Sequence, residues 1–376
     1  MTELSLVFLG LSITSSWGNG HATTYRSLLR ELARRGHDVL FLEREAPYHA
    51  ANRDLPAGSC GRTELYGSRE ELEDRFGAAI RRADAVVLGS HVPEGVAIGD
   101  WICQTTRGFR VFYDIDTATT LRALATGGAR YLLPRQVRAF DLYLSFTGGP
   151  TLRRLTREYG APRARALYCS ADPDVHLPAN EHHYWDLGYL GTYDADRQPT
   201  LASLLMASAR DWPDGRFVVA GSQYPANLGW PRNVQHIAHV AAPDHCSFYN
   251  RQRFTLNVTR GDMTLAGWTP SVRLFEAAAC GTPIISDACW GIDQFFEPDR
   301  EILLARNSVH VLAALRGMPE EKRRALGDNA RRRVLSEHTS AHRAEAFEEY
   351  ISELGAVRNR SSRPRSSAVS APGEQS

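Results

Sequence analysis

The chain has 376 residues, a length that favours two domains over one. Hydrophobic residues make up 43% of it and charged residues 23%, as is typical of a globular protein. The formal net charge of +1 gives no electrostatic reason to expect nucleic acid or an acidic membrane surface as a partner, so we expect neither.

The six cysteines show neither a C-x-x-C pair nor metal-ligand spacing. Several lie in apolar segments, where a reduced cysteine behaves as a small hydrophobic residue, and this favours a reducing compartment. Near the N-terminus, Glu3 stands where a signal peptide would be basic. Because no apolar run approaches the about 20 residues that cross a bilayer, we predict a cytoplasmic protein without a transmembrane segment.

Short apolar runs rich in strand-forming residues alternate with amphipathic segments through the first half of the chain. Residues 21–35 are typical of a helix, with leucines on one face and arginines on another, and Gly36 provides its end. Alternation of this kind predicts a doubly wound parallel sheet. The expected strands are 4–10, 38–43, 85–89, 110–115, 142–146 and 166–170.

A polar stretch with two prolines, 171–186, interrupts the pattern, which then starts again. The strands expected in the second half are 187–191, 217–222, 234–240, 254–258, 283–287 and 301–305. We therefore predict two Rossmann-like domains. The predicted segments are an N-terminal domain over 1–172, a linker over 173–186, a C-terminal domain over 187–338, a last helix over 339–355 that packs back towards the N-terminal domain, and a disordered tail over 356–376.

The segment GNGHAT, residues 18–23, follows the first strand and is similar to a dinucleotide-binding loop, with Glu43 as the acid for a ribose. The loop before Gly20 is too long for that motif, and Thr23 takes the place of its third glycine. We therefore interpret the segment as a flexible glycine loop beside a cleft. His21 is a candidate catalytic residue that points into this cleft, unless it is an ordinary surface histidine.

Two segments contain residues of a kind that binds metal ions. Asp114 and Asp116 end a central strand, where open α/β sheets form their ligand crevice, so both are candidate catalytic residues. A D-x-D pair also suits a divalent cation, and Asp116 or Thr117 can instead cap the next helix. We assign His182 and His183 to the linker, because adjacent side chains rarely point to the same spot. We expect no metal site.

The stretch PSVRLFEAAACGTPIISD, residues 270–287, predicts a helix followed by a strand. Thr269 is suited to cap the helix, Pro270 to occupy its first position and Gly281 to end it. Almost every side chain within it is apolar, as in buried helices. Glu276 is therefore expected to be a buried or cleft-lining carboxylate, which is costly without a partner.

Two partners for Glu276 fit the sequence. Arg273 lies one turn earlier in the helix and can form an ion pair. A ribose is the alternative, because its vicinal hydroxyls can donate two hydrogen bonds to one carboxylate. The N-terminus of the same helix would then offer backbone N–H groups to a diphosphate, so a single helix would hold both parts of a nucleotide.

At these residues the chain resembles the C-terminal domain of GT-B glycosyltransferases, whose retaining members bind the donor with the signature E-x7-E…A-x-G-x-P-V-I. FEAAACGTPIISD matches the second half of that signature. PSVRLFEAAACG contains the pattern S-x-R-x-F-E-A and looks most similar to the CgeB-like (spore maturation protein B) members. TLNVTR at 255–260 and GHATTYRSLLRELARRGHDV near the N-terminus fit the same family.

The resemblance implies an α/β GT-B fold, in which two Rossmann-like doubly wound domains face each other across a cleft, and it implies that Glu276 binds the donor ribose. The first glutamate of the signature is replaced by Trp268, so donor identity and retaining stereochemistry do not transfer. Neither a metal nor a cofactor is implied, because GT-B enzymes generally stabilise the leaving diphosphate with side chains and a helix dipole. The other donor residues that it implies are Arg273, Arg260, Ser271, Gly191, Thr192 and Gly221.

We therefore expect a glycosyltransferase that moves a sugar from a nucleotide-diphosphate-sugar donor to a hydroxyl or amine of a small-molecule or glycan acceptor. Three alternatives remain. A sugar-nucleotide epimerase can share the fold, and a nicotinamide-dependent dehydrogenase would use the glycine loop. A non-catalytic binding or coat protein with the GT-B fold is the third, because Trp268 replaces a residue that contacts the donor sugar.

Overall fold

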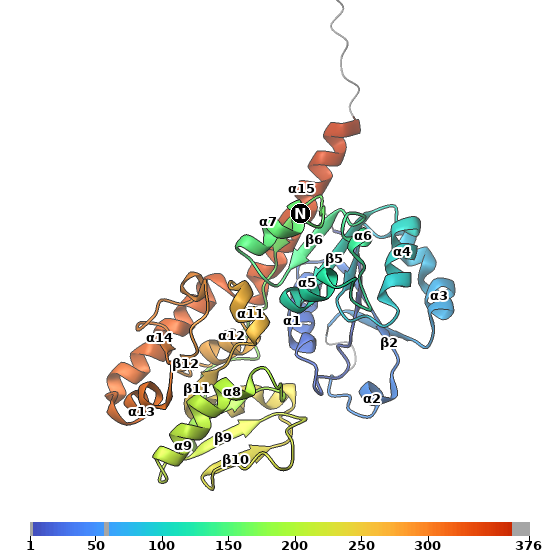
Figure 1. Cartoon of the computed structure of the whole chain (residues 1–376). Helices are drawn as coiled ribbons and strands as arrows, with labels where there is room; N and C mark the ends of the chain where they lie inside the picture. Colours follow the sequence, from blue (N-terminus) through green and yellow to red (C-terminus); the bar gives the residue numbers. More distant parts are fainter. Residues whose placement is uncertain (1–2, 56–59, 363–376) are drawn as a thin grey trace, which may run out of the picture.

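The computed structural model of the chain describes residues 3–55 and 60–362. It contains two α/β domains, each built on one parallel sheet, and a long C-terminal helix that runs from the second domain to the first (Figure 1). The first sheet has the strand order β3-β2-β1-β4-β5-β6-β7 and is parallel throughout. Its strands are β1 (Ser5–Gly10), β2 (Asp38–Arg44), β3 (Arg62–Tyr66), β4 (Ala85–Gly89), β5 (Phe109–Asp114), β6 (Leu142–Ser145) and β7 (Ala164–Ala166).

Both faces of the first sheet are buried under helices. Alternate residues of β1 enter different apolar cores, Leu6 and Phe8 one of them and Val7 and Leu9 the other. Strands that are covered on both sides read as continuous apolar runs, which is why the sequence pattern found them. The helices of this domain are α1 (His21–Arg34), α2 (Pro47–Ala50), α3 (Arg69–Arg82), α4 (Gly95–Thr105), α5 (Thr117–Ala125), α6 (Pro134–Val137) and α7 (Pro150–Arg157).

The second sheet repeats the arrangement with the order β10-β9-β8-β11-β12-β13 and is also parallel. Its strands are β8 (Trp185–Leu190), β9 (Phe217–Ala220), β10 (Val234–Ile237), β11 (Gln252–Asn257), β12 (Ile284–Ser286) and β13 (Leu303–Leu304). The α-helices of this domain are α8 (Gln198–Leu201), α9 (Ala207–Asp211), α10 (His245–Asn250), α11 (Gly261–Ala266), α12 (Val272–Ala279), α13 (Ser308–Gly317) and α14 (Glu320–Glu337).

The last helix, α15 (Ser340–Ser362), packs on α1 of the N-terminal domain (Figure 1). Its Glu348 is 2% exposed, accepts two hydrogen bonds from the Arg35 guanidinium at 2.7 and 2.6 Å, and lies 2.8 Å from Nε2 of His37. This buried ion pair ties the C-terminal end of the chain to the first domain. Within residues 3–55 and 60–362, none of the helices combines the length and the apolarity needed to span a bilayer.

Four local features differ from what the sequence predicted. The strand expected over 166–170 is instead β7, which ends at Ala166. The edge strand β3 was not expected, because its sequence RTELY is polar and only one of its residues is buried. Helix α12 begins at Val272, with Ser271 at its N-cap, rather than at Pro270. The expected disorder from residue 356 onwards is also wrong for 356–362, which continue α15, whereas 363–376 lie outside the described residues.

Candidate active site

A cleft of about 570 Å³ lies between the two domains. Most of its lining comes from segments that directly follow strands, namely β1, β4 and β5 of the N-terminal domain and β8, β9 and β11 of the C-terminal domain. Parallel strands direct their carboxyl ends to one edge of a sheet, so the two domains turn equivalent edges towards each other. The first turns of α1, α10 and α12 complete the walls.

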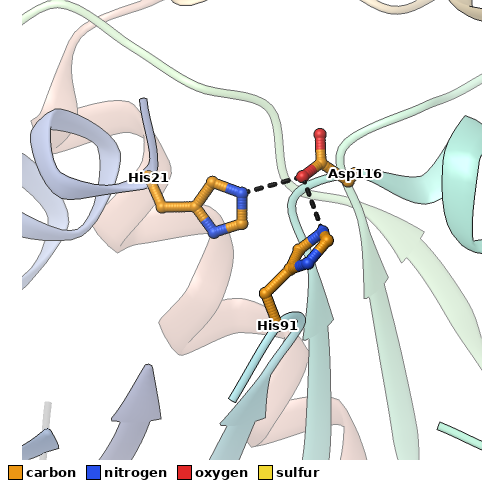
Figure 2. Close-up of side chains that lie close together, drawn as sticks. All are labelled: His21, His91 and Asp116. Carbon is orange, nitrogen blue, oxygen red and sulfur yellow. Dashed lines mark hydrogen bonds and ion pairs between the residues drawn. The ribbon is translucent and has the colours of Figure 1, made fainter. Parts of the chain in front are cut away.

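Three polar side chains meet on the N-terminal wall (Figure 2). His21 is the first residue of α1, His91 follows β4, and Asp116 follows β5. Both histidines place Nε2 at 2.9 Å from Oδ2 of Asp116. His91 has a φ of 63°, a left-handed conformation that is rare for residues with a side chain, so packing holds its backbone in place. We call these residues the Asp116 cluster.

Asp116 carries a negative charge at neutral pH. Burial opposes this charge, but the interactions with His21 and His91 outweigh it and hold the pKa of the carboxyl well below its usual value. Arg260 of the other domain reaches towards it, with Nη1 3.7 Å from Oδ1. Asp116 occupies the N-cap position of α5 but its side chain makes no capping hydrogen bond. The side chain of Asp116 therefore lies in the cleft and does not cap α5.

Asp114 does not reach the cleft, which corrects the expectation that it belongs to the candidate catalytic residues. Its side chain is 0% exposed and accepts hydrogen bonds from the hydroxyls of Tyr143 at 2.6 Å and Thr120 at 2.8 Å. Burial raises its pKa to about 6 in spite of these bonds. It also accepts the backbone N–H of Asp116 at 3.2 Å, so Asp114 supports the turn that presents Asp116.

The glycine loop after β1 is held within its own domain by Glu43. This carboxylate is 1% exposed and accepts hydrogen bonds from the backbone N–H of Ile13 at 2.8 Å and the hydroxyl of Thr14 at 2.6 Å. Glu43, the residue that would bind a ribose in a dinucleotide motif, therefore already accepts hydrogen bonds from its own domain. The loop instead meets the C-terminal domain, where the rings of Trp17 and His239 pack with centroids 4.3 Å apart.

A second carboxylate between two histidines lies on the C-terminal wall. Glu276 of α12 is 1% exposed and accepts a hydrogen bond from the hydroxyl of Tyr249 at 3.2 Å. His245 of α10 places Nδ1 at 3.3 Å from Oε2, and His176 of the linker places Nε2 at 3.8 Å from Oε1. Burial opposes the charge of Glu276, but electrostatic attraction to the two histidines lowers its pKa to about 2. We call His176, His245 and Glu276 the Glu276 cluster.

Arg273 is not the partner of Glu276, so this alternative from the sequence is wrong. Its guanidinium extends towards the ends of β8 and β11, where it donates to the carbonyl of Leu190 and to Oδ1 of Asn257, the latter at 2.8 Å. It also stacks 4.7 Å from the ring centroid of Tyr189. Among the described residues, no carboxylate forms an ion pair with it. Arg273 therefore brings a positive charge, fixed in position, to the cleft.

Three arginines of the C-terminal domain converge on the cleft, Arg197, Arg260 and Arg273. Arg197 donates to the carbonyl of Thr192 at 2.6 Å, while its Nε is buried without a hydrogen-bond partner. Burial lowers its pKa, and the charges of Arg273 and Arg260 lower it further. Arg260 pairs with Asp194 at 3.2 Å. Cations that repel one another at close range are stabilised by a bound anion, so this wall suits a polyanionic group.

The remaining predicted donor residues lie on the same wall. Gly191, Thr192, Gly221 and Ser271 all line the cleft. The loops after β8 and β9 touch, since a Cβ on Gly221 would stand 2.1 Å from the carbonyl oxygen of Gly191. A Cβ on Gly191 would stand 2.7 Å from Nη2 of Arg273. Close packing against backbone therefore requires glycine at 221, and a side chain at 191 would displace the Arg273 guanidinium.

Trp268, at the position of the first glutamate of the donor signature, is not among the residues that line the cleft. It has a φ of 48°, and its ring covers Gly149 of one domain and Gly291 of the other so closely that a Cβ on either would lie 2.5 Å from it. Its carbonyl accepts the N–H of Gly148 at 3.0 Å. Trp268 therefore packs the two domains together, which explains why an aromatic residue is tolerated there.

Four polar residues that the structure brings to these clusters were missed in the sequence, His91, His176, Arg197 and His245. Each stands alone in a loop or at a helix start, where nothing in the local pattern separates it from a surface residue. The sequence signal that could have identified some of these residues is their position directly after a predicted strand. His91 and Arg197 closely follow β4 and β8, at the strand edge where ligand-binding groups gather in open α/β sheets.

Residues 197–349 match the family described as "Glycosyl transferase-like". No curated protein sequence is detectably similar to the chain. Among solved structures, sucrose-phosphate synthase from Thermosynechococcus elongatus is similar with a TM-score of 0.69 at 17% identity, over 94% of this chain and 99% of that one. Anabaena HepE in complex with UDP and glucose has a TM-score of 0.69 at 12% identity, over 93% and 100%.

An alpha-glucosyltransferase in complex with UDP is similar to the same degree, with a TM-score of 0.69 at 12% identity over 92% of this chain and 99% of that one. At such low identities the likeness establishes the fold. The two parallel sheets, their strand orders and the cleft between them agree with it. The chain therefore has the GT-B fold that the sequence predicted, and its C-terminal part matches a glycosyltransferase family.

Proposed function

We propose that the protein is a glycosyltransferase that transfers a sugar from a nucleotide-diphosphate-sugar donor to an acceptor hydroxyl or amine. The family match over 197–349 and the likeness to sucrose-phosphate synthase, HepE and alpha-glucosyltransferase support this activity. The pattern S-x-R-x-F-E-A further supports a relationship to the CgeB-like members. The donor would bind to the C-terminal wall of the cleft and the acceptor to the N-terminal wall.

The observation that carries the proposal is the convergence of Arg197, Arg260 and Arg273 with the ionised Glu276 on one wall. A nucleoside diphosphate needs both kinds of group. Its phosphates would neutralise the mutual repulsion of the arginines, and its ribose hydroxyls would donate to Glu276. With three guanidinium groups beside the phosphates, the charge of the leaving diphosphate would be stabilised by side chains, so we propose that transfer requires no metal ion.

On the opposite wall, the Asp116 cluster suits the acceptor. An ionised carboxylate accepts the hydrogen bond of an incoming hydroxyl and so positions its oxygen. A neighbouring imidazole in its neutral form can take up the hydroxyl proton as the new glycosidic bond forms and the bond between the sugar and the diphosphate breaks. Oδ2 of Asp116 is occupied by His21 and His91, which leaves Oδ1 for the acceptor. Closure of the two domains would bring the donor carbon to this oxygen and exclude water, which limits hydrolysis of the donor.

The test begins with binding. Purified full-length protein is titrated with UDP, GDP, ADP, CMP and dTDP by calorimetry and thermal unfolding, beside Glu276→Gln and the control Glu297→Gln. Glu297 is an exposed carboxylate of the same domain that pairs with Arg300. One nucleotide should stabilise the wild type and Glu297→Gln by about 2.7 kcal/mol at 100 times its Kd, but not Glu276→Gln. UDP is the first choice, since it is the nucleotide bound by HepE and the alpha-glucosyltransferase.

Turnover is tested with donors that carry the selected nucleotide and a radiolabelled sugar. Release of the nucleotide together with movement of the label onto an acceptor identifies a transferase. A changed sugar that stays on the nucleotide identifies an epimerase instead. If no nucleotide binds and Glu276→Gln only lowers the melting temperature, the carboxylate is a structural group and the proposal fails.

A further inference from the structure

The Glu276 cluster contains buried polar atoms that the protein leaves without hydrogen bonds. Both ring nitrogens of His176, Nδ1 of His245 and Oε1 of Glu276 are inaccessible to solvent, yet none has a hydrogen-bond partner among the described residues. His176 and Glu276 are 6% and 1% exposed. Buried polar atoms in folded proteins are nearly always satisfied, and those that remain point to a water molecule or an ion that completes the site.

The separations between these atoms are compatible with ligands around a metal ion, and the longer of the two exceeds the length of a hydrogen bond. His176 Nε2 and Glu276 Oε1 are 3.8 Å apart, and His245 Nδ1 and Glu276 Oε2 are 3.3 Å apart. A hydrogen bond brings N and O to about 2.9 Å. Ligands bound at about 2.0–2.1 Å to a tetrahedral zinc ion lie about 3.3 Å from one another. All three side chains offer ligand atoms within 4.8 Å of each other.

The chemistry of the three ligands selects the ion. Two imidazoles and one carboxylate suit Zn²⁺ and similar transition metals, whereas Mg²⁺ and Ca²⁺ prefer oxygen ligands throughout. The three ligands come from three separate elements, the linker, α10 and α12, so the fold assembles the site. Tyr249 donates to Oε2 of Glu276 and orients the carboxylate from behind, as supporting residues do in metal sites.

We propose that His176, His245 and Glu276 bind a divalent transition-metal ion, with Zn²⁺ as the best match, and that this ion competes with the donor nucleotide. His245 and Glu276 line the cleft and His176 lies outside its lining, so the ion would keep an open coordination position towards the cleft. The competition rests on the proposed function, because Glu276 cannot ligate the ion and accept the ribose hydroxyls at the same time. The metal would then inhibit the enzyme and take no part in transfer.

The Asp116 cluster serves as the internal comparison. It also combines two histidines with a carboxylate, and Nδ1 of His21 and Nε2 of His91 lack hydrogen-bond partners among the described residues, but both histidines lie 2.9 Å from the carboxylate and His21 is hydrogen-bonded to it. Arg260 at 3.7 Å from Asp116 further disfavours a cation there. The proposal therefore assigns the metal to the Glu276 cluster alone.

The experiment uses the full-length protein, stripped with a chelator and dialysed. Zn²⁺ binding is measured by calorimetry, and Co²⁺ is added as a spectroscopic probe of tetrahedral geometry. The wild type should bind one ion tightly, His176→Gln should bind it more than about 10-fold more weakly, and His91→Gln should match the wild type. A second variant, His245→Gln, guards against a folding defect in His176→Gln, and circular dichroism checks both.

Competition is measured by repeating the nucleotide titration with one equivalent of Zn²⁺ bound. The apparent nucleotide affinity of the wild type should fall, and in His176→Gln it should no longer respond to Zn²⁺. Equal Zn²⁺ binding by the wild type, His176→Gln and His245→Gln, or none by the wild type, would overturn the site. Unchanged nucleotide affinity in the zinc-bound wild type would overturn the competition. Zn²⁺ binding without any nucleotide binding would leave the metal site standing and reject the proposed function.

Discussion

Each wall of the cleft carries a cluster of two histidines and one carboxylate, but the distances within the two clusters differ. In the Asp116 cluster both histidines lie at hydrogen-bond distance from one carboxylate oxygen, and an arginine of the other domain approaches the second oxygen. In the Glu276 cluster the histidines lie farther away, and a tyrosine provides the carboxylate's only hydrogen bond among the described residues. The carboxylate of the first cluster is held closely by its neighbours, whereas one oxygen of the second carboxylate has no hydrogen-bond partner among the described residues.

This difference shows that residue composition does not determine the role of a polar cluster. Both carboxylates are ionised at neutral pH, because histidines lower the pKa of each. A carboxylate that two histidines hold through one oxygen, as in Asp116, keeps one position and can offer its other oxygen to a reacting group. A carboxylate with a free oxygen is ready to accept an external donor or ligand. We therefore propose that the Asp116 cluster binds the acceptor and the Glu276 cluster binds the donor.

The largest expected effect is on the rate of transfer. Asp116→Asn keeps the shape of the side chain but removes its charge, so we expect kcat to fall by about 10²–10⁴-fold while nucleotide affinity stays unchanged. Steady-state kinetics and calorimetry measure the two quantities. Asp100→Asn, which breaks an ion pair with Arg135 on the surface of the same domain, is the control and should keep its activity. Loss of nucleotide affinity in Asp116→Asn would show that the N-terminal wall also contributes to donor binding, and would contradict the separate roles proposed for the two walls.

The next effect is on donor binding. Glu276→Gln replaces a carboxylate that accepts two charged hydrogen bonds, each of about 1.5–3 kcal/mol, so we expect nucleotide affinity to fall about 100-fold or more. Calorimetry gives the change directly. Nucleotides in which one ribose hydroxyl is methylated sharpen the test, because the methylated oxygen cannot donate a hydrogen bond. Such an analogue should bind the wild type more weakly than the unmodified nucleotide does, but should bind Glu276→Gln equally well. Equal losses in both proteins would show that the carboxylate does not contact the ribose.

A smaller effect is expected for Arg260, which faces Asp116 and Asp194 in the cleft. Arg260→Gln should lower nucleotide affinity about 10-fold, since one charged hydrogen bond contributes about 1.5 kcal/mol or more. It should change the free energy of unfolding by less than about 1 kcal/mol, because its ion pairs are partly exposed. Calorimetry and urea unfolding separate the two. A change in stability without a change in affinity would make Arg260 a link between the domains rather than a phosphate ligand.

The smallest effect is on stability as a function of pH. The pKa of Asp116 is lower in the folded protein than in the unfolded chain, so its ionisation stabilises the fold above about pH 4. As the pH falls further, protonation removes the attraction to His21, His91 and Arg260 and this contribution is lost. The wild type should therefore exceed Asp116→Asn by about 1 kcal/mol at pH 7 and lose that advantage on acidification. Urea unfolding of both proteins across pH 3–7 tests this, and a constant difference would contradict it.

Much of the fold was predictable because the buried strands carry continuous apolar runs. Strand β4, AVVLG, is buried at every residue, and such a run has few alternatives to a covered parallel strand. Strand β3 was missed because an edge strand needs only half of its side chains in contact with the core, so its sequence RTELY stays polar. The extent of α15 (Figure 1) was underestimated because the residues after 355 are mostly polar, although Arg358 still contacts Phe109 and Arg107 of the N-terminal domain.

The candidate site was predictable only where a residue contradicts its local pattern. Glu276 stands out as a charge within an apolar helix, and Asp116 stands out at the end of a strand. Asp114 has the same local signal as Asp116, and only packing decides that its carboxylate turns to Tyr143 and Thr120 instead of the cleft. No local feature of the sequence separates their roles.

By itself, the sequence determined the two parallel sheets, the order of their elements and the helix that carries Glu276, because hydrophobic periodicity and glycine stops act over a few neighbouring residues. The tertiary structure decided which polar side chains meet. His21 and His91 reach Asp116, and His176 and His245 reach Glu276, from elements far apart in the chain. Such meetings depend on how sheets and linker pack in space, and local chain geometry does not encode them.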